Sequence, residues 1–190
     1  MQNNYIEGQV FEKENFTENN PEKADYENCS FINCNFSNAN LSQLNFIDCQ
    51  FDACNLSNVN LYQTSFQDIL FKDCKMLGLN FEKHNAFGFS IKVENCQLNH
   101  SSFYKCKLSK TQFKNSNLQE VDFTEADLNQ AIFSECDLQN AIFQQTNLQK
   151  ADFRTSYNFA IDPEINQLKA AKFSLESLGG LLTKYQIAIE

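Results

Sequence analysis

Cysteine and histidine are the residues of this chain with the most chemistry to offer, because thiolates and imidazoles bind metals and serve as nucleophiles or bases. The sequence holds eight cysteines and two histidines, His84 and His100. The cysteines are Cys29, Cys34, Cys49, Cys54, Cys74, Cys96, Cys106 and Cys136. Metal or redox chemistry requires such side chains to converge on one point. Whether these cysteines and histidines can form such a site therefore depends on the secondary structure that positions them.

A five-residue repeat runs through most of the chain. Its marker is a large apolar residue, here called the centre, at every fifth position from Phe11 to Phe81 and again from Leu98 to Phe153. Of these 27 positions, 26 are apolar, where the composition alone predicts about 11. The exception is Pro21. The repeat is therefore not a product of chance.

The repeat predicts extended backbone. A smaller residue, usually Ala, Cys or Val, lies two positions before most centres, and residues two apart point to the same side only in a strand. Each unit is predicted to be a very short strand followed by two polar residues that turn the chain. A period of five fits neither an α-helix nor a coiled coil. The pattern predicts an all-β fold, a parallel β-solenoid filled by its own side chains.

The alternation of Leu and Phe centres from Leu98 to Phe153 indicates four sides to each coil. With 20 residues per coil, each column along the axis holds one residue type, and Phe faces Phe across the interior. Lys105 precedes Glu125 and Lys107 precedes Asp127 by the same interval, close enough to pair across stacked strands ~4.8 Å apart. Residues 1–160 are predicted to form about seven such coils.

This arrangement argues against metal or redox chemistry. Every cysteine lies two residues before a centre, the position of a small buried side chain. Cys34, Cys54 and Cys74 would form a column along the axis rather than a metal shell. They could lie near disulfide distance, but in a reducing cytoplasm we expect thiols. We expect no metal and no cofactor.

Catalytic signatures are also missing. The two histidines lie near the break in the repeat with no fixed partner, whereas a general base needs a second oriented group. Phosphate-loop, dinucleotide, zinc-protease and nucleophile-elbow motifs are absent from the sequence. We expect no catalytic residue and no enzyme.

Two segments depart from the repeat. The register breaks over residues 82–97, where Gly88 between two phenylalanines suggests a bulge or kink. Residues 161–190 are predicted either to cap the rod or to join two copies end to end, with Ser174 opening a short α-helix and residues 187–189 as a final strand. The residues expected at such a dimer contact are Leu175, Leu178, Leu181, Leu182, Tyr185, Ile187 and Ile189.

The chain is acidic, with 24 Asp and Glu against 15 Lys and Arg and a net charge of −9. Such a protein should repel nucleic acid and anionic lipid and attract the basic surfaces that bind them. The charge could simply keep a rod soluble, or it could form an acidic face that imitates DNA only in part. The residues expected on such a face are Asp48, Asp52, Asp68, Asp73, Glu120, Asp122, Glu125, Asp127, Glu135 and Asp137.

No run of 18 apolar residues is present, so nothing is expected to span a membrane. The opening residues are acidic and lack the apolar stretch of a secretory signal. We expect a cytoplasmic location.

The units resemble the motif of the pentapeptide-repeat proteins, A-D/N-L/F-x-x, over roughly residues 9–160. That resemblance implies a right-handed quadrilateral β-helix. Three segments are most similar to the Qnr and MfpA type: FINCNFSNANLSQLNFIDCQF (31–51), AFGFSIKVENC (86–96) and GLLTKYQIAI (180–189).

Proteins of that type are acidic, rod-shaped dimers that bind DNA gyrase and topoisomerase IV and protect against quinolones. The resemblance therefore implies a DNA mimic that modulates a type II topoisomerase, with quinolone tolerance and a C-terminal homodimer, and without direct nucleic-acid binding. Qnr members typically carry two loops between coils, and this chain has none within 26–81 or 98–153, like the loop-free members. The alternative from a different class is a structural or protein-interaction scaffold with an unrelated partner.

Overall fold

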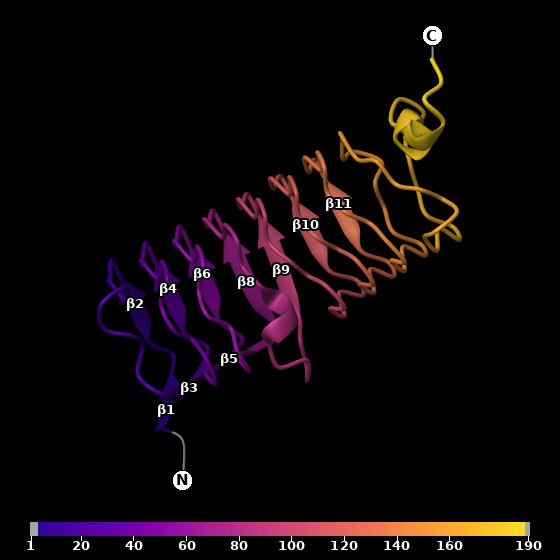
Figure 1. The fold of residues 1–190 in the computed structure, drawn as a ribbon. Helices are drawn as coiled ribbons and strands as arrows, with labels where there is room; N and C mark the ends of the chain where they lie inside the picture. Colours follow the sequence, from indigo (N-terminus) through magenta and orange to yellow (C-terminus); the bar gives the residue numbers. More distant parts are fainter. Residues whose placement is uncertain (1–3, 189–190) are drawn as a thin grey trace.

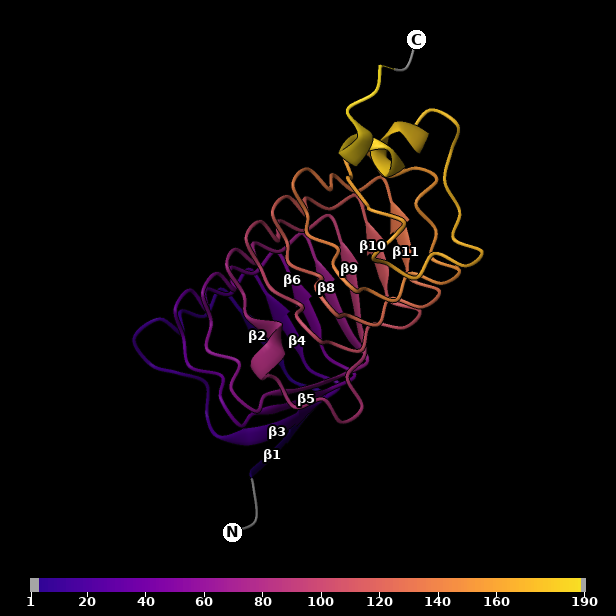
Figure 2. The same cartoon turned by 45° about the vertical axis from the view of Figure 1, so that its right-hand side comes forward.

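A computed structural model describes residues 4–188, which form a rod of stacked coils with the two ends of the chain at opposite ends of the rod (Figures 1 and 2). The strands are three or four residues long and form two parallel sheets. One sheet holds β1 (Asn4–Glu7), β3 (Ala24–Glu27), β5 (Asn45–Ile47) and β7 (Ser65–Gln67). The other holds β2 (Val10–Glu12), β4 (Ser30–Ile32), β6 (Gln50–Asp52), β8 (Ile69–Lys72), β9 (Ile91–Glu94), β10 (Gln112–Lys114) and β11 (Ile132–Ser134).

The coil has four sides, numbered here in chain order. Side 1 carries β1, β3, β5 and β7 and continues as bridges from Lys107 to Gln167. Side 2 carries the 7-stranded sheet. Sides 3 and 4 are held by single bridges, such as Asn35 to Asn55 on side 3 and Asn40 to Asn60 on side 4. The predicted all-β solenoid of about seven coils is confirmed.

Residues 20 apart stack on one another, as the Leu and Phe alternation predicts. Phe113 pairs with Phe133 on side 2, and their rings stack at 5.1 Å. Phe103 and Phe123 stack at 5.5 Å on side 4. Rings of the two sides meet edge to face across the interior, as Phe113 and Phe123 do at 6.0 Å. The core is thus built of continuous columns of rings, each ring gaining both stacked and edge contacts.

The position two before each centre also points inward, and it bonds to the backbone. All eight cysteines are buried and unpaired in disulfides. The Cys54 thiol donates to Phe31 O at 3.2 Å, while Thr146 and Ser101 occupy the same position and donate to carbonyls at 2.9 and 2.8 Å. A small side chain with a donor suits this place, because it satisfies a carbonyl of the previous coil without filling the core.

At almost every corner, where the chain turns from one side of the coil to the next, one residue has left-handed backbone. The second residue after almost every centre has positive φ, for example Asn33 at 54°, Ala53 at 52° and Glu120 at 57°. Asn and Asp tolerate this conformation best. Its amide donates to the next coil, as Glu120 does to Gln139 O at 3.0 Å. The sequence predicts a polar turn at this place but not its left-handed conformation.

The break in the repeat enlarges one coil without interrupting side 2. Ile69 pairs with Ile91 across β8 and β9, an interval of 22 residues. The two extra residues fall between η1 (Phe81–Lys83), a 3₁₀ turn, and β9, where the chain bulges from the stack (Figure 2). Gly88 lies there with φ of 68° and packs so closely on Gln67 that a Cβ atom would lie 3.0 Å from it.

The C-terminal segment corrects the sequence prediction, because it forms two 3₁₀ turns rather than an α-helix: η2 (Leu178–Leu181) and η3 (Thr183–Tyr185). Gly180 lies against Phe159, where a Cβ atom would come within 2.4 Å of the Phe159 carbonyl. Ser177, not Ser174, precedes the first turn. Residues 187 and 188 are in no strand, and Ile189 lies outside the described residues.

The coils continue beyond Phe153, the last centre of the regular repeat, since Asp152 bridges to Lys172 on side 2. None of the helices within residues 4–188 has the length and apolar character needed to cross a membrane.

Candidate interaction surfaces

The residue before each centre and the two after it face outward, so every side presents three positions per coil. The ten predicted acidic residues occupy these positions, but they are distributed over all four sides. Side 1 carries Asp48, Asp68 and Asp127, side 2 carries Asp52, Asp73 and Glu135, side 3 carries Glu120 and Asp137, and side 4 carries Asp122 and Glu125. The structure does not bring them together on one face.

Three of these carboxylates support the turns. Asp122, Asp127 and Asp137 precede a centre, and each accepts the backbone N–H of the residue two positions on, at 2.8, 3.1 and 3.1 Å. Asn35 does the same at 3.1 Å. These are Asx turns, which fix the corner after each strand. Their role here is explained by the fold, without a partner.

Other predicted acids are paired with bases on the same or a neighbouring coil. Glu125 lies 3.4 Å from Lys105, as the 20-residue spacing predicts. Lys72 lies 3.4 Å from Asp52 and 3.7 Å from Asp73. Lys107 and Asp127 are also bridged through their backbones, but the Asp127 carboxylate accepts from the Ser109 hydroxyl at 2.7 Å. Such surface pairs contribute roughly 0–1 kcal/mol each.

A continuous acidic surface lies on the N-terminal half of side 1, and it is only partly the one expected. It consists of Glu7, Asp25, Glu27, Asp48 and Asp68, on the four stacked strands β1, β3, β5 and β7 and the corners after them. None of the outward positions of these strands and corners carries a base. The Tyr5 hydroxyl donates to Glu27, and this hydrogen bond raises the pKa of Tyr5 to about 12.

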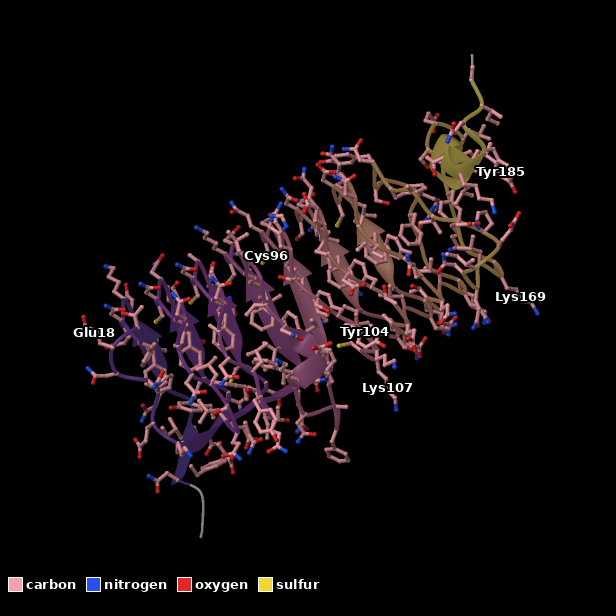
Figure 3. The ribbon with its side chains drawn as sticks, in the orientation of Figure 1. Glu18, Cys96, Tyr104, Lys107, Lys169 and Tyr185 are labelled. Atoms are coloured by element: carbon pink, nitrogen blue, oxygen red, sulfur yellow. The ribbon has the colours of Figure 1, made fainter. Side chains whose placement is uncertain are left out.

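The C-terminal half of the same side is basic. Its outward positions carry Lys107, Lys110, Lys150 and Lys169, with Asp127 as the single acid of that half within the described residues. Lys107 and Lys169 both point away from the rod on this side (Figure 3). The Asp127 carboxylate is also bonded to Asn147 at 2.8 Å.

The bulge of residues 84–90 separates the two halves. Asn85 N donates to Thr64 O at 2.8 Å, and Ser90 N donates to Phe66 O at 3.0 Å, so both ends of the bulge are fixed to β7 and its approach. Phe87 between them is 79% exposed. Beside it lies a hollow of about 400 Å³ lined by residues 82–84, Ala86 and residues 104–107.

A second apolar surface lies at the C-terminal end. Leu175 is 84% exposed, and Leu178, Tyr185 and Ile187 are exposed as well, whereas Leu181 packs against the core and Leu182 is half-buried. The segment is held to the rod by polar contacts. Lys184 lies 2.9 Å from Asp162 and 2.6 Å from Glu164, and the two carboxylates raise its pKa.

The histidines do not form a site. Burial lowers the pKa of His84, whose ring packs on Phe89 at 3.9 Å, and His100 lies on the surface 2.9 Å from Glu120. Among residues 4–188, no three Cys, His, Asp or Glu side chains gather in a way that could hold a metal ion.

The sequence model of the pentapeptide repeat region matches residues 24–92 and 89–153 of this chain, the part that builds the coils. The chain belongs to the pentapeptide-repeat family. Among curated proteins, no sequence matches this pentapeptide-repeat protein.

Two solved structures are similar to this pentapeptide-repeat protein. QnrB1, a plasmid-mediated fluoroquinolone resistance protein, aligns with 22% identity and a TM-score of 0.48 over 96% of this chain and 100% of its own. HetL, a pentapeptide repeat protein involved in heterocyst differentiation regulation from the cyanobacterium Nostoc sp. strain PCC 7120, aligns with 12% identity and a TM-score of 0.44, over 92% and 88%.

Proposed function

We propose that this pentapeptide-repeat protein is a non-enzymatic rod that binds a type II topoisomerase, DNA gyrase or topoisomerase IV, at a surface that otherwise holds DNA. The observation that carries the proposal is the acidic half of side 1. Glu7 and Glu27 stack directly in adjacent coils, and Asp48 and Asp68 follow at the corners of the next two.

The charge spacing of this surface imitates one DNA strand only in part. Strands of adjacent coils lie ~4.8 Å apart, while successive phosphates of one DNA strand rise ~3.4 Å. Lys and Arg side chains bind carboxylates with the same charge-assisted hydrogen bonds that they make to phosphates. The segments similar to the Qnr and MfpA type make a topoisomerase the first partner to test, and quinolone tolerance is the expected phenotype.

A supercoiling assay tests the proposal. We expect the protein to change gyrase supercoiling at micromolar concentration, and the double variant Asp48→Asn, Asp68→Asn to lose most of that effect. Asn already occupies the same left-handed corner at Asn28 and Asn33, so the fold should tolerate both changes. The matched control is Asp73→Asn with Glu135→Gln, at equivalent corners of side 2. Parallel assays with a quinolone would separate drug protection from binding.

The second candidate is an interaction scaffold with an unrelated partner. It is favoured by the distribution of the other acids over four sides and by the change of side 1 from acidic to basic, neither of which DNA shows. No effect on gyrase or topoisomerase IV at micromolar concentration would favour the scaffold.

A further inference from the structure

Side 1 has a charge pattern with an internal symmetry. Four coil levels precede the bulge of residues 84–90 and four follow it, with centres Ile6, Tyr26, Phe46 and Phe66 before it and Leu108, Leu128, Leu148 and Leu168 after it. All the charged residues at the outward positions of the first four levels are acids, whereas those of the last four levels are four lysines and Asp127. The sign changes at the middle of the side.

We propose that side 1 is a self-complementary surface on which two copies of this chain pair antiparallel, with the acidic half of each over the basic half of the other. A two-fold axis across the rods, close to the bulge, generates this arrangement and places each contact in the interface twice. A parallel pair would instead oppose acid to acid and lysine to lysine, which costs free energy. The charge pattern therefore selects both the partner and its direction.

The positions across the width of the side agree as well. A two-fold axis perpendicular to the rods keeps corner residues opposite corner residues. The corners of the acidic half carry Asp48 and Asp68, and those of the basic half carry Lys110 and Lys150, all with left-handed backbone. Asp127 lies before its centre rather than at a corner, and its bonds to Ser109 and Asn147 hold its charge within its own rod.

Phe87 supplies the apolar part of the contact. A phenylalanine that is 79% exposed at the tip of an anchored bulge lies near the proposed axis. The hollow of about 400 Å³ lies directly beside it, with Ala86, Tyr104 and Cys106 among its lining. Near a two-fold axis, the Phe87 ring of each copy can enter the hollow of the other, and aromatic anchors in pockets are the usual strong points of interfaces.

This pairing does not depend on the proposed function, although the two would compete. The antiparallel pair covers Asp48 and Asp68, so a basic partner would have to displace the second copy. Self-association can be measured without any topoisomerase. Failure of one proposal is thereby distinguishable from failure of the other.

The experiment is analytical ultracentrifugation of the full chain carrying Leu175→Asp and Ile187→Asp, exposed positions whose change removes any end-to-end contact. We expect reversible dimers whose Kd rises about 10-fold or more between about 0.05 and about 0.5 M NaCl, because salt screens surface charges. A monomer under all these conditions, or a dimer indifferent to salt, would overturn the proposal.

Charge reversal then tests the surface. Asp48→Lys with Asp68→Lys should raise Kd about 10-fold or more, as should Lys110→Asp with Lys150→Asp. The combined four-residue variant should raise Kd about 10-fold less than the product of the two separate effects, because its corners again carry opposite charges in the two copies while the other charges of side 1 are unchanged. The chain already places Lys and Asp at such corners, for example at Lys105 and Asp73.

The matched control reverses Asp73 and Glu135 to Lys, two corners of side 2 with the same change of net charge. It should leave Kd unchanged, and Phe87→Ser should weaken pairing about 10-fold. The proposal fails if the side 2 control weakens pairing as much as the side 1 variant, or if the effects of the two side 1 reversals simply multiply in the four-residue variant.

Discussion

At the scale of single residues, the cysteines are structural. Their thiols occupy the small inward position and donate to backbone carbonyls, and burial raises the pKa of Cys106 and of Cys136 to about 12. We expect a thiol reagent to label few of the eight cysteines in the native protein and all of them after unfolding in urea, because the thiolate is the reactive form. Mass spectrometry counts the labels. Rapid native labelling of most cysteines would contradict their buried placement.

The same thiols should make stability depend on alkaline pH. Their pKa is near 9 in the unfolded chain and about 12 in the folded one. Between these values the native state binds more protons than the unfolded state, so the free energy of unfolding falls as pH rises. Each such thiol contributes up to about 1.4 kcal/mol per pH unit. Urea unfolding from pH about 8 to about 11 measures the slope.

Cys106→Ala with Cys136→Ala should flatten this slope, because two of the groups that must stay protonated are removed. Alanine already holds the equivalent inward position at Ala126 and Ala131, both buried. An unchanged slope would mean that other groups cause the loss of stability at high pH. One such group is Tyr26, since burial raises its pKa to about 12.

The corners offer a backbone test. Ala53 is exposed with φ of 52°, a conformation that is strained for alanine and free for glycine. Ala53→Gly should therefore stabilise the protein by roughly 0.5–1 kcal/mol. Ala126→Gly, at a buried position, should destabilise it by removing a core methyl group. Urea midpoints of the two variants should move in opposite directions, and a shift in the same direction would argue against the left-handed corner.

At the scale of elements, the columns of rings are the main support of the rod. Phe123 stacks on Phe103 at 5.5 Å and on Phe143 at 5.2 Å, so Phe123→Ala should cost about 3–5 kcal/mol. Denaturation under urea measures the loss. Phe87→Ala, at an exposed ring, is the control and should cost little. A loss below about 1 kcal/mol for Phe123→Ala would contradict its central place in the core.

These columns could be predicted from the sequence because side-chain burial alone fixes them. The spacing of five between Leu98 and Phe153 determines which residues point inward, and four sides follow from the alternation of Leu and Phe. The left-handed corners leave a weaker signal, since lysine, glutamate and alanine occupy them alongside asparagine. The C-terminal turns could not be predicted from helical spacing, because the contact of Gly180 with Phe159 depends on how the last coil closes.

The surface was harder to predict than the core for a physical reason. Charges meet along columns 20 residues apart, and the coil of 22 residues shifts every later column. Linear blocks of acid, such as residues 115–149, wrap around all four sides. The acidic surface of side 1 could have been found from two pairs, Glu7 with Glu27 and Asp48 with Asp68, because the residues of each pair are about 20 positions apart and therefore stack. Only the assembled coil shows that both pairs share one side with Lys110 and Lys150.

At the scale of the whole molecule, the exposed apolar side chains at the C-terminal end offer a second contact between copies. Leu175, Leu178, Tyr185 and Ile187 are exposed on a segment that ion pairs hold to the rod, so a contact there would not require the segment to refold. Burying an exposed Leu contributes ~1.5–3 kcal/mol, and a two-fold contact uses each residue twice. Two rods joined end to end would roughly double the length available to a two-fold symmetric partner.

In about 0.5 M NaCl, which screens pairing through side 1, we expect light scattering to show the full-length protein as an end-to-end dimer at tens of micromolar. Leu175→Asp with Ile187→Asp should abolish this contact, because two buried charges in each copy would lose their hydration. Deleting residues 174–190 should also remove it. The deletion would also remove Gly180, which lies against Phe159, and Leu181, which packs on the core, so the point variants are the cleaner test. Lys114→Ala, exposed on side 2, is the control. If the point variants leave the mass unchanged while the reversals on side 1 reduce it, the antiparallel pair alone accounts for assembly, and the acidic surface is then covered in the resting protein.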